Sequence, residues 1–286
     1  MNPNTIRYLE DYNKCVVEID LNIRNISGLF DLSEYKKLIR SGCSHNKINK
    51  LILPETLLIL DCSNNEIVNL DNLPTSLCKL NCSNNQIIQL NNLPSSLTEL
   101  YCAKNMITQL DYLPTSLILL NCCNNDITQL DNLPIQLAEL YCSNNQIVQL
   151  NNLLNTLIKL ECTFNKITQL NNLPNSLTYL DCSCNSMIEL NNLPNSLKNL
   201  NCSHNSIAEL KNFPDSLKFL NCSHNSIAEL NNLPNSLFFL DYSHNQITEL
   251  NNVPSMIYLT YINCRNNKIT NPDILKKMFP NTKIEY

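Results

Sequence analysis

Residues 77–96 read LCKLNCSNNQIIQLNNLPSS, and units of this kind follow one another every 20 residues between about Leu57 and Leu250. The unit has the form L-x-x-L-x-C-x-x-N-x-I-x-x-L-x-x-L-P-x-x. Its first leucine recurs at Leu57, Leu77, Leu97, Leu117, Leu137, Leu157, Leu177, Leu197, Leu217 and Leu237. A fixed spacing kept over this many units predicts a repeat architecture, in which each unit packs on the next.

The pattern continues imperfectly at both ends of this array. Residues 38–54 form a unit that is one residue short, and residues 16–29 form a degenerate one. Residues 259–269 form a unit delayed by two residues, followed by a short helix in PDILKKMF and a last strand in TKIEY, with Ile284 expected in the cysteine position. We predict one solenoid domain over residues 1–286, with caps at 1–15 and 271–286 and about thirteen repeats over 16–270.

These residues resemble the leucine-rich repeat family, whose core motif is L-x-x-L-x-L-x-x-N-x-L, over nearly the whole chain. The short unit with Leu-Pro in its second half looks like the compact repeats of bacterial secreted effectors. The bias toward cysteine, isoleucine and asparagine is similar to that of repeat proteins from giant DNA viruses. Some effectors of this kind carry a separate ubiquitin-ligase domain, and we expect none here because repeats and caps account for the residues.

The alternation of apolar and variable residues in L-x-x-L-x-C is typical of a strand. One strand per unit implies a parallel sheet on the concave face, and 20 residues leave no room for a convex helix. We therefore expect extended or 3₁₀ segments on the convex side and little α-helix. The recurring asparagine should bond to the backbone of adjacent turns, and with only 2 glycines in the chain asparagine should also occupy left-handed turns.

The chain has 15 cysteines, most of them at the strand-end position of the unit. Cysteines at this position are Cys43, Cys62, Cys82, Cys102, Cys122, Cys142, Cys162, Cys182, Cys202, Cys222 and Cys264. We interpret them as small buried apolar side chains. Disulfides are disfavoured because parallel neighbours lie near the ~4.8 Å strand spacing, whereas a disulfide needs Cβ atoms ~3.8 Å apart. We predict reduced thiols and no metal, since no C-x-x-C pair occurs.

Composition excludes several classes of function. The net charge is −5 and the 20 lysines and arginines are scattered, which disfavours nucleic-acid binding. No phosphate-binding glycine loop is present. Neither a signal-peptide run nor an apolar stretch of ~20 residues occurs, so we expect no membrane span. We predict a monomer in a reducing cytoplasmic compartment, which could be a host cytoplasm.

The variable positions that flank the second leucine of each unit should project from the sheet. Aromatic anchors dominate many protein interfaces. We therefore choose as candidate protein-binding residues Tyr101, Tyr141, Tyr179, Phe219 and Phe239. The alternative is neutral variation on a tolerant surface.

All four histidines share one repeat position, and His204, His224 and His244 occupy consecutive units. They should form a surface row, which could bind a partner, hold a metal or respond to pH. The alternative is simple duplication, because LNCSHNSIAEL occurs at 200–210 and again at 220–230. We include the three histidines among the candidate protein-binding residues and predict no metal site.

No arrangement of side chains indicates catalysis or a cofactor, so we predict a non-enzymatic protein–protein interaction scaffold that binds an unidentified protein on its concave face. The alternative function is that of a structural or particle-associated protein of a large DNA virus or a similar assembly.

Overall fold

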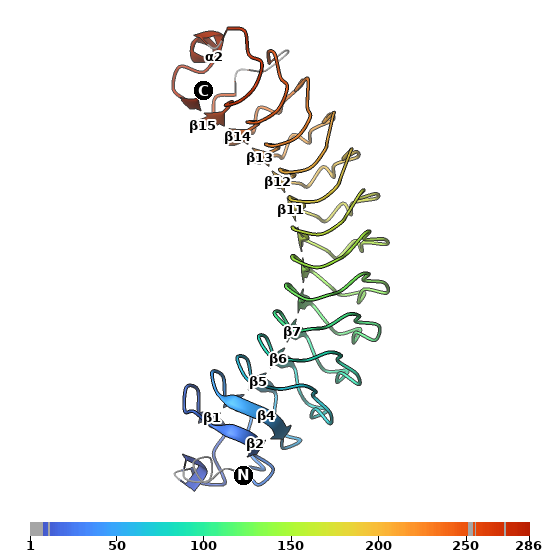
Figure 1. The fold of residues 1–286 in the computed structure, drawn as a ribbon, viewed down its shortest axis with the longest axis vertical. Coiled ribbons are helices and arrows are strands. Elements are labelled where there is room, and N and C mark those ends of the chain that lie inside the picture. The colour runs from blue at the N-terminus through green and yellow to red at the C-terminus, as the bar shows by residue number, and fades with distance from the viewer. Residues whose placement is uncertain (1–7, 11, 251–253, 255, 272) are drawn as a thin grey trace. The chain divides into compact units, whose positions relative to one another are not determined.

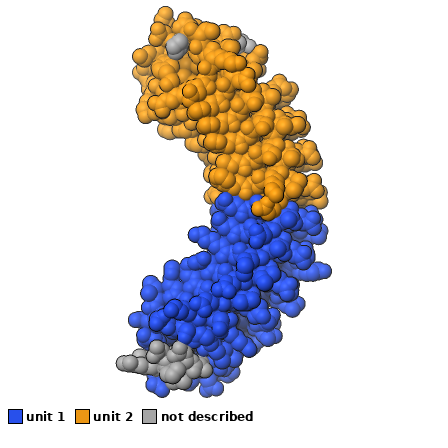
Figure 2. Space-filling view, in the orientation of Figure 1, with its two compact units in different colours: residues 1–145 blue, residues 146–286 orange. Residues whose placement is uncertain are grey.

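The computed structural model describes residues 8–10, 12–250, 254, 256–271 and 273–286. It divides into two compact units, residues 1–145 and 146–286, which are coloured separately in Figure 2. Each unit is a parallel β-solenoid with one short strand per turn, and together they contain about 13 turns. In a typical three-residue strand the second leucine of the repeat is buried between two half-exposed neighbours.

In the first unit, the strands of the main sheet follow one another in chain order along one edge (Figure 1). They are β1 (Glu18–Asp20), β3 (Arg40–Gly42), β5 (Ile59–Asp61), β6 (Lys79–Asn81), β7 (Glu99–Tyr101), β8 (Leu119–Asn121) and β9 (Glu139–Tyr141). A second, two-stranded parallel sheet pairs β2 (Ser27–Asp31) with β4 (Lys47–Ile52). This second sheet occupies return segments for which the sequence predicted only extended chain.

In the second unit, each strand also pairs in parallel with the next, and equivalent residues of successive repeats lie opposite each other. The strands are β10 (Lys159–Glu161), β11 (Tyr179–Asp181), β12 (Asn199–Asn201), β13 (Phe219–Asn221), β14 (Phe239–Asp241), β15 (Tyr261–Asn263) and β16 (Lys283–Glu285). The expected delay of two residues is confirmed, because Phe239 lies opposite Tyr261.

The carboxyl-terminal elements follow the sequence prediction with one correction. Helix α2 (Asp273–Met278) buries Leu275, and β16 adds the expected last strand. Ile284, however, lies opposite Ile262 and therefore takes the second-leucine position, so its placement in the cysteine position was wrong. The error arose because the last segment is too short to fix its own register. Of the predicted amino-terminal cap, residues 1–7 and 11 lie outside the described residues, and the cap boundaries stay predictions.

The asparagine after each strand joins adjacent turns, as predicted. The Asn125 side chain is 7% exposed, and its Nδ2 donates to the carbonyl oxygens of Cys102 and Cys122, each at 3.0 Å. Its Oδ1 accepts from the amide of Ile107 at 3.0 Å. One side chain thus satisfies three backbone groups in the interior, where unpaired groups are costly.

Asparagine also supplies the left-handed turns that glycine usually makes. Most repeats have two such turns, for example at Asn64 and Asn72, whose φ angles are 54° and 57°. At the first of the two positions Lys104, Phe164, Cys184 and the histidines replace asparagine in some repeats. Asparagine tolerates this conformation better than most residues with a Cβ. The return segments are otherwise extended, with one i→i+3 turn per repeat such as that from Leu77 N–H to Pro74 O at 3.0 Å. Within the described ranges no helix is long and apolar enough to cross a membrane.

Candidate functional site

The outward side chains on either side of the buried central residue of each strand form a surface that we call the strand face. In the first unit it carries Tyr101 and Tyr141, whose hydroxyls donate to Glu99 at 3.0 Å and Glu139 at 2.5 Å. Asn121 lies opposite both tyrosines in the ladder, so the two rings are separated by one strand. The structure therefore does not bring these two candidates into contact.

Lys79 organises the neighbourhood of Tyr101. Its Nζ lies 2.6 Å from Glu99 Oε2 and 5.2 Å from the Tyr101 ring centroid. The hydrogen bond from Lys79 lowers the pKa of Glu99, whereas burial and then the Glu99 carboxylate raise the pKa of Tyr101. The three side chains form a fixed, hydrogen-bonded cluster, which is suited to polar recognition.

In the second unit, the strand face becomes aromatic toward its carboxyl-terminal end. Phe219 and Phe239 stack with ring centroids 4.4 Å apart and an interplanar angle of 8°. Tyr261 continues the stack, 4.8 Å from Phe239 and inclined by 10°. Tyr179 stands apart, because Asn199 lies between it and Phe219 in the ladder. Lys159 Nζ lies 4.7 Å from the Tyr179 ring centroid.

Tyr261 was not among the predicted binding residues because its repeat is delayed by two residues. The signal was available, since Tyr261 directly precedes Ile262, the second apolar residue of that repeat. Phe238 and Tyr258, which are 57% and 63% exposed, were also not among the predicted residues, because neither occupies a strand-flanking position.

Phe219, Phe238, Phe239 and Tyr258 line a groove of about 460 Å³ in the second unit. We call it the aromatic groove, and it is lined by Asn199, Lys218, Phe219, Ser236, Phe238, Phe239 and Tyr258. A groove with mostly apolar walls and a few polar groups is typical of a binding site.

The three consecutive histidines form the predicted row, at the turns that follow the strands. Their ring centroids are 4.0 Å apart between His204 and His224 and 3.9 Å apart between His224 and His244. Each has a left-handed φ of 52–53° and is exposed. At one end, His244 Nε2 lies 2.9 Å from Asn266 Nδ2. The row lies beyond the strand ends, so it is a feature separate from the aromatic groove.

Stacking of the three imidazole rings affects the protonation of His224. Partial burial, followed by the charges of His204 and His244, lowers the pKa of His224. The nitrogen lone pairs lie in the ring planes, so parallel stacked rings do not direct them at an atom between the rings. Among the described residues no group of three or more His, Cys, Asp or Glu side chains could hold a metal ion.

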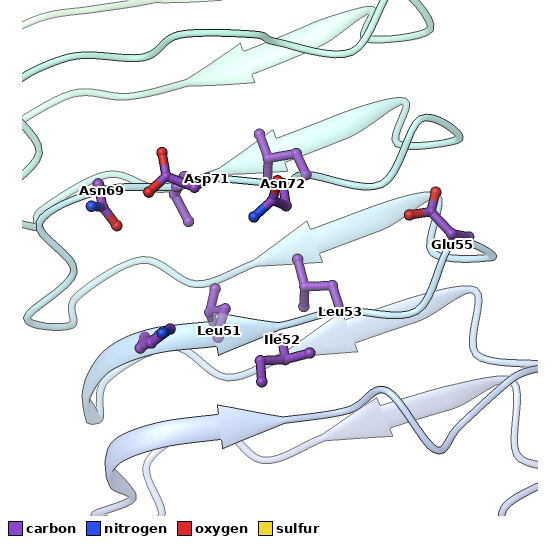
Figure 3. A pocket seen from close by; sticks show the side chains of 10 residues that line it. Leu51, Ile52, Leu53, Glu55, Asn69, Asp71 and Asn72 are labelled. Carbon is purple, nitrogen blue, oxygen red and sulfur yellow. The ribbon is translucent and has the colours of Figure 1, made fainter.

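A further hollow, of about 410 Å³, lies in the first unit between return segments (Figure 3). Leu51, Ile52 and Leu53 line one side, and Asn69, Asp71 and Asn72 of the next repeat line the other. Glu55, at its margin, accepts a hydrogen bond from the Thr75 amide at 3.2 Å. This hollow is a gap between the return segments of two adjacent turns.

Comparison of the chain with family models gives no match, and neither does comparison with curated proteins. Solved structures do match. YopM from Yersinia enterocolitica WA-314 is 31% identical with a TM-score of 0.74, over 87% of this chain and 65% of that one. YopM from Yersinia pestis, a leucine-rich effector protein, is 32% identical with a TM-score of 0.82, over 88% of this chain and 72% of that one. The chain belongs to the leucine-rich repeat family.

A third leucine-rich repeat structure, the functional domain of InlJ from Listeria monocytogenes, is described as including a cysteine ladder. It is 29% identical with a TM-score of 0.67, over 88% of this chain and 68% of that one. The present leucine-rich repeat chain spans 65% of the length of the first YopM structure.

The cysteines of this leucine-rich repeat chain also form ladders within each unit. Cys82 and Cys202 are fully buried, at the position where the family motif has leucine. Burial raises the pKa of both thiols to about 12. Because the thiolate is the reactive form, these side chains serve packing rather than nucleophilic chemistry.

Proposed function

We propose that this leucine-rich repeat chain is a non-enzymatic scaffold that binds another protein through its strand face and the adjoining aromatic groove. The observation that carries the proposal is the stack of Phe219, Phe239 and Tyr261, which stays half-exposed on a rigid sheet. Large aromatic side chains held in place lose little entropy on binding and supply much of the contact area at interfaces. The leucine-rich repeat relatives support a protein-interaction role in general.

The rigidity of the support strengthens this proposal. The backbone that carries the aromatic stack is hydrogen-bonded to adjacent turns. Phe219 N–H donates to Lys198 O and Phe239 N–H donates to Lys218 O, each at 3.1 Å. Polar neighbours are also fixed, because Asn263 Nδ2 donates to Asp241 Oδ2 at 3.0 Å. A preorganised surface avoids part of the cost of ordering side chains on association.

The test is co-purification of partners with the tagged full chain from its native cells. A triple variant, Tyr141→Ala, Tyr179→Ala and Phe219→Ala, removes strand-face rings from both units. A matched control, Val68→Ala, Val148→Ala and Ile188→Ala, removes exposed apolar side chains outside the strand face.

We expect a discrete protein to accompany the native chain and the control variant, and to be lost from the strand-face variant. Recovery of the same proteins with all three chains, or of further copies of the chain alone, would overturn the proposal. The second result would favour a structural role.

A further inference from the structure

The central ring of the aromatic stack, Phe239, presents its edge rather than its faces to solvent. Phe239 is covered on one face by Phe219 and on the other by Tyr261, at 4.4 and 4.8 Å between centroids. Only the edge of the Phe239 ring therefore stays accessible to a ligand. Aromatic edges carry partial positive charge, so they favour the face of a partner's aromatic ring or an oxygen atom. Stacking of nucleic-acid bases on Phe239 is blocked because both of its faces are occupied.

Two lysines place positive charge beside the aromatic groove. Lys218 lines the groove, and Lys198 is its equivalent in the preceding repeat, since the following residues, Asn199 and Phe219, lie opposite each other. Both lysines are exposed, and within the described parts of the chain neither forms an ion pair. The two lysines are therefore about 4.8 Å apart along the sheet. Two positive charges this close together attract an acidic ligand.

The opposite flank of the strand face is acidic but internally bonded. Asp181 accepts from Ser183 Oγ at 2.7 Å and from Asn201 Nδ2 at 3.1 Å. Asp241 accepts from Ser243 Oγ at 2.7 Å. The carboxylates are thus engaged with neighbouring donors, whereas the two lysines offer their charges to a ligand. The charge of the surface therefore changes across the sheet, from the lysines before the strands to Asp181 and Asp241 at the strand ends.

We propose that the aromatic groove binds an acidic peptide segment of the partner protein, with an aromatic side chain inserted between Phe238 and Tyr258 and its neighbouring carboxylates over Lys198 and Lys218. This inference rests on the proposed function and specifies the partner chemistry. The inserted ring meets the edges of Phe219 and Phe239 with its face, the arrangement that aromatic pairs prefer. A groove of about 460 Å³ is large enough for one aromatic side chain and its adjoining backbone.

The experiment measures fluorescence anisotropy of labelled synthetic peptides with the full chain at low ionic strength. The first peptide has a central phenylalanine flanked by glutamates. In the second, glutamines replace the glutamates, and in the third alanine replaces phenylalanine. A fourth carries lysines in place of the glutamates, and labelled oligothymidine tests for a nucleic-acid ligand.

We expect saturable binding of the first peptide, with each of the other peptides weaker by about tenfold. The double variant Lys198→Glu and Lys218→Glu should lose the first peptide and gain the lysine peptide. Lys166→Glu, an exposed lysine of the same unit outside the groove, should change nothing. Phe238→Ala should weaken the first peptide, while Ile188→Ala, which removes a side chain that is 68% exposed, should not.

Three results would overturn the inference: no saturable binding of the acidic peptide up to about millimolar concentration, equal binding of the glutamate and glutamine peptides, or tighter binding of oligothymidine. These are distinguishable from failure of the proposed function. A partner lost on mutation of the strand face, together with absence of acidic-peptide binding, would keep the scaffold and discard the acidic ligand.

Discussion

Replacement of Asn125 by alanine should destabilise the first unit by about 4 kcal/mol. The side chain is the acceptor for Ile107 N–H, and burial of that amide without a partner costs about 2 kcal/mol. Its two bonds to Cys102 O and Cys122 O contribute about 1 kcal/mol each. These carbonyls keep a second donor, Asn105 and Asn145 respectively, so they are not left unpaired.

The assay is urea unfolding followed by far-ultraviolet circular dichroism, with Asn91→Ala as the control because Asn91 is exposed on the return segment. We expect the control to change the free energy of unfolding by less than about 0.5 kcal/mol. Hydrogen exchange at Ile107 reports the same site directly, and its amide should lose protection. A loss from Asn125→Ala no larger than that of the control would refute the account of the asparagine ladder.

Three further perturbations test the left-handed turns, the cysteines and the histidine row. Phe164→Asn should raise the urea midpoint and stabilise the chain by about 0.5–1 kcal/mol. Phe164 has a left-handed φ of 51°, a conformation that asparagine adopts more readily. An unchanged or lower midpoint would contradict this. In the native chain the exposed Cys15 should react rapidly with a thiol reagent, whereas the buried Cys82 should react only after unfolding. Alkylation in denaturant without reductant should modify all 15 thiols. Thiols that stay unmodified, as measured by intact mass, would argue against reduced cysteines. Because the pKa of His224 is lowered in the folded chain, the unfolded chain binds more protons than the folded chain below about pH 6.5, and stability should fall as the pH is lowered there. His224→Asn should reduce this fall in the urea midpoint. An unchanged dependence on pH would exclude His224 as its source.

Much of the fold was predictable because each repeat packs on a copy of itself. A strict spacing places Leu80 beside Leu100, and so on along each unit, so the strand register needs no long-range information. The asparagine ladder followed from the same logic, since a polar residue at a core position must find backbone partners in the adjacent turns. The pairing of β2 with β4 was not predictable, because it depends on how two atypical return segments meet.

The site was predictable only in outline. The positions of Phe219 and Phe239 on the strand face followed from the repeat, but their parallel stacking depends on side-chain rotamers that the pattern does not encode. Phe238 and Tyr258 lie outside the strand-flanking positions, so a search of those positions could not reveal the groove they line with Lys218. The chemistry proposed for the ligand arises from this three-dimensional arrangement.

The central claim is that a partner protein contacts the strand face at the aromatic groove. Site-specific photo-crosslinking in native cells tests it most directly, with a photoreactive phenylalanine analogue placed at Asn199 in the groove or at Ile188 outside the strand face. We expect a discrete crosslinked protein from position 199 and none from position 188. The same products from both positions, or none from position 199, would contradict it.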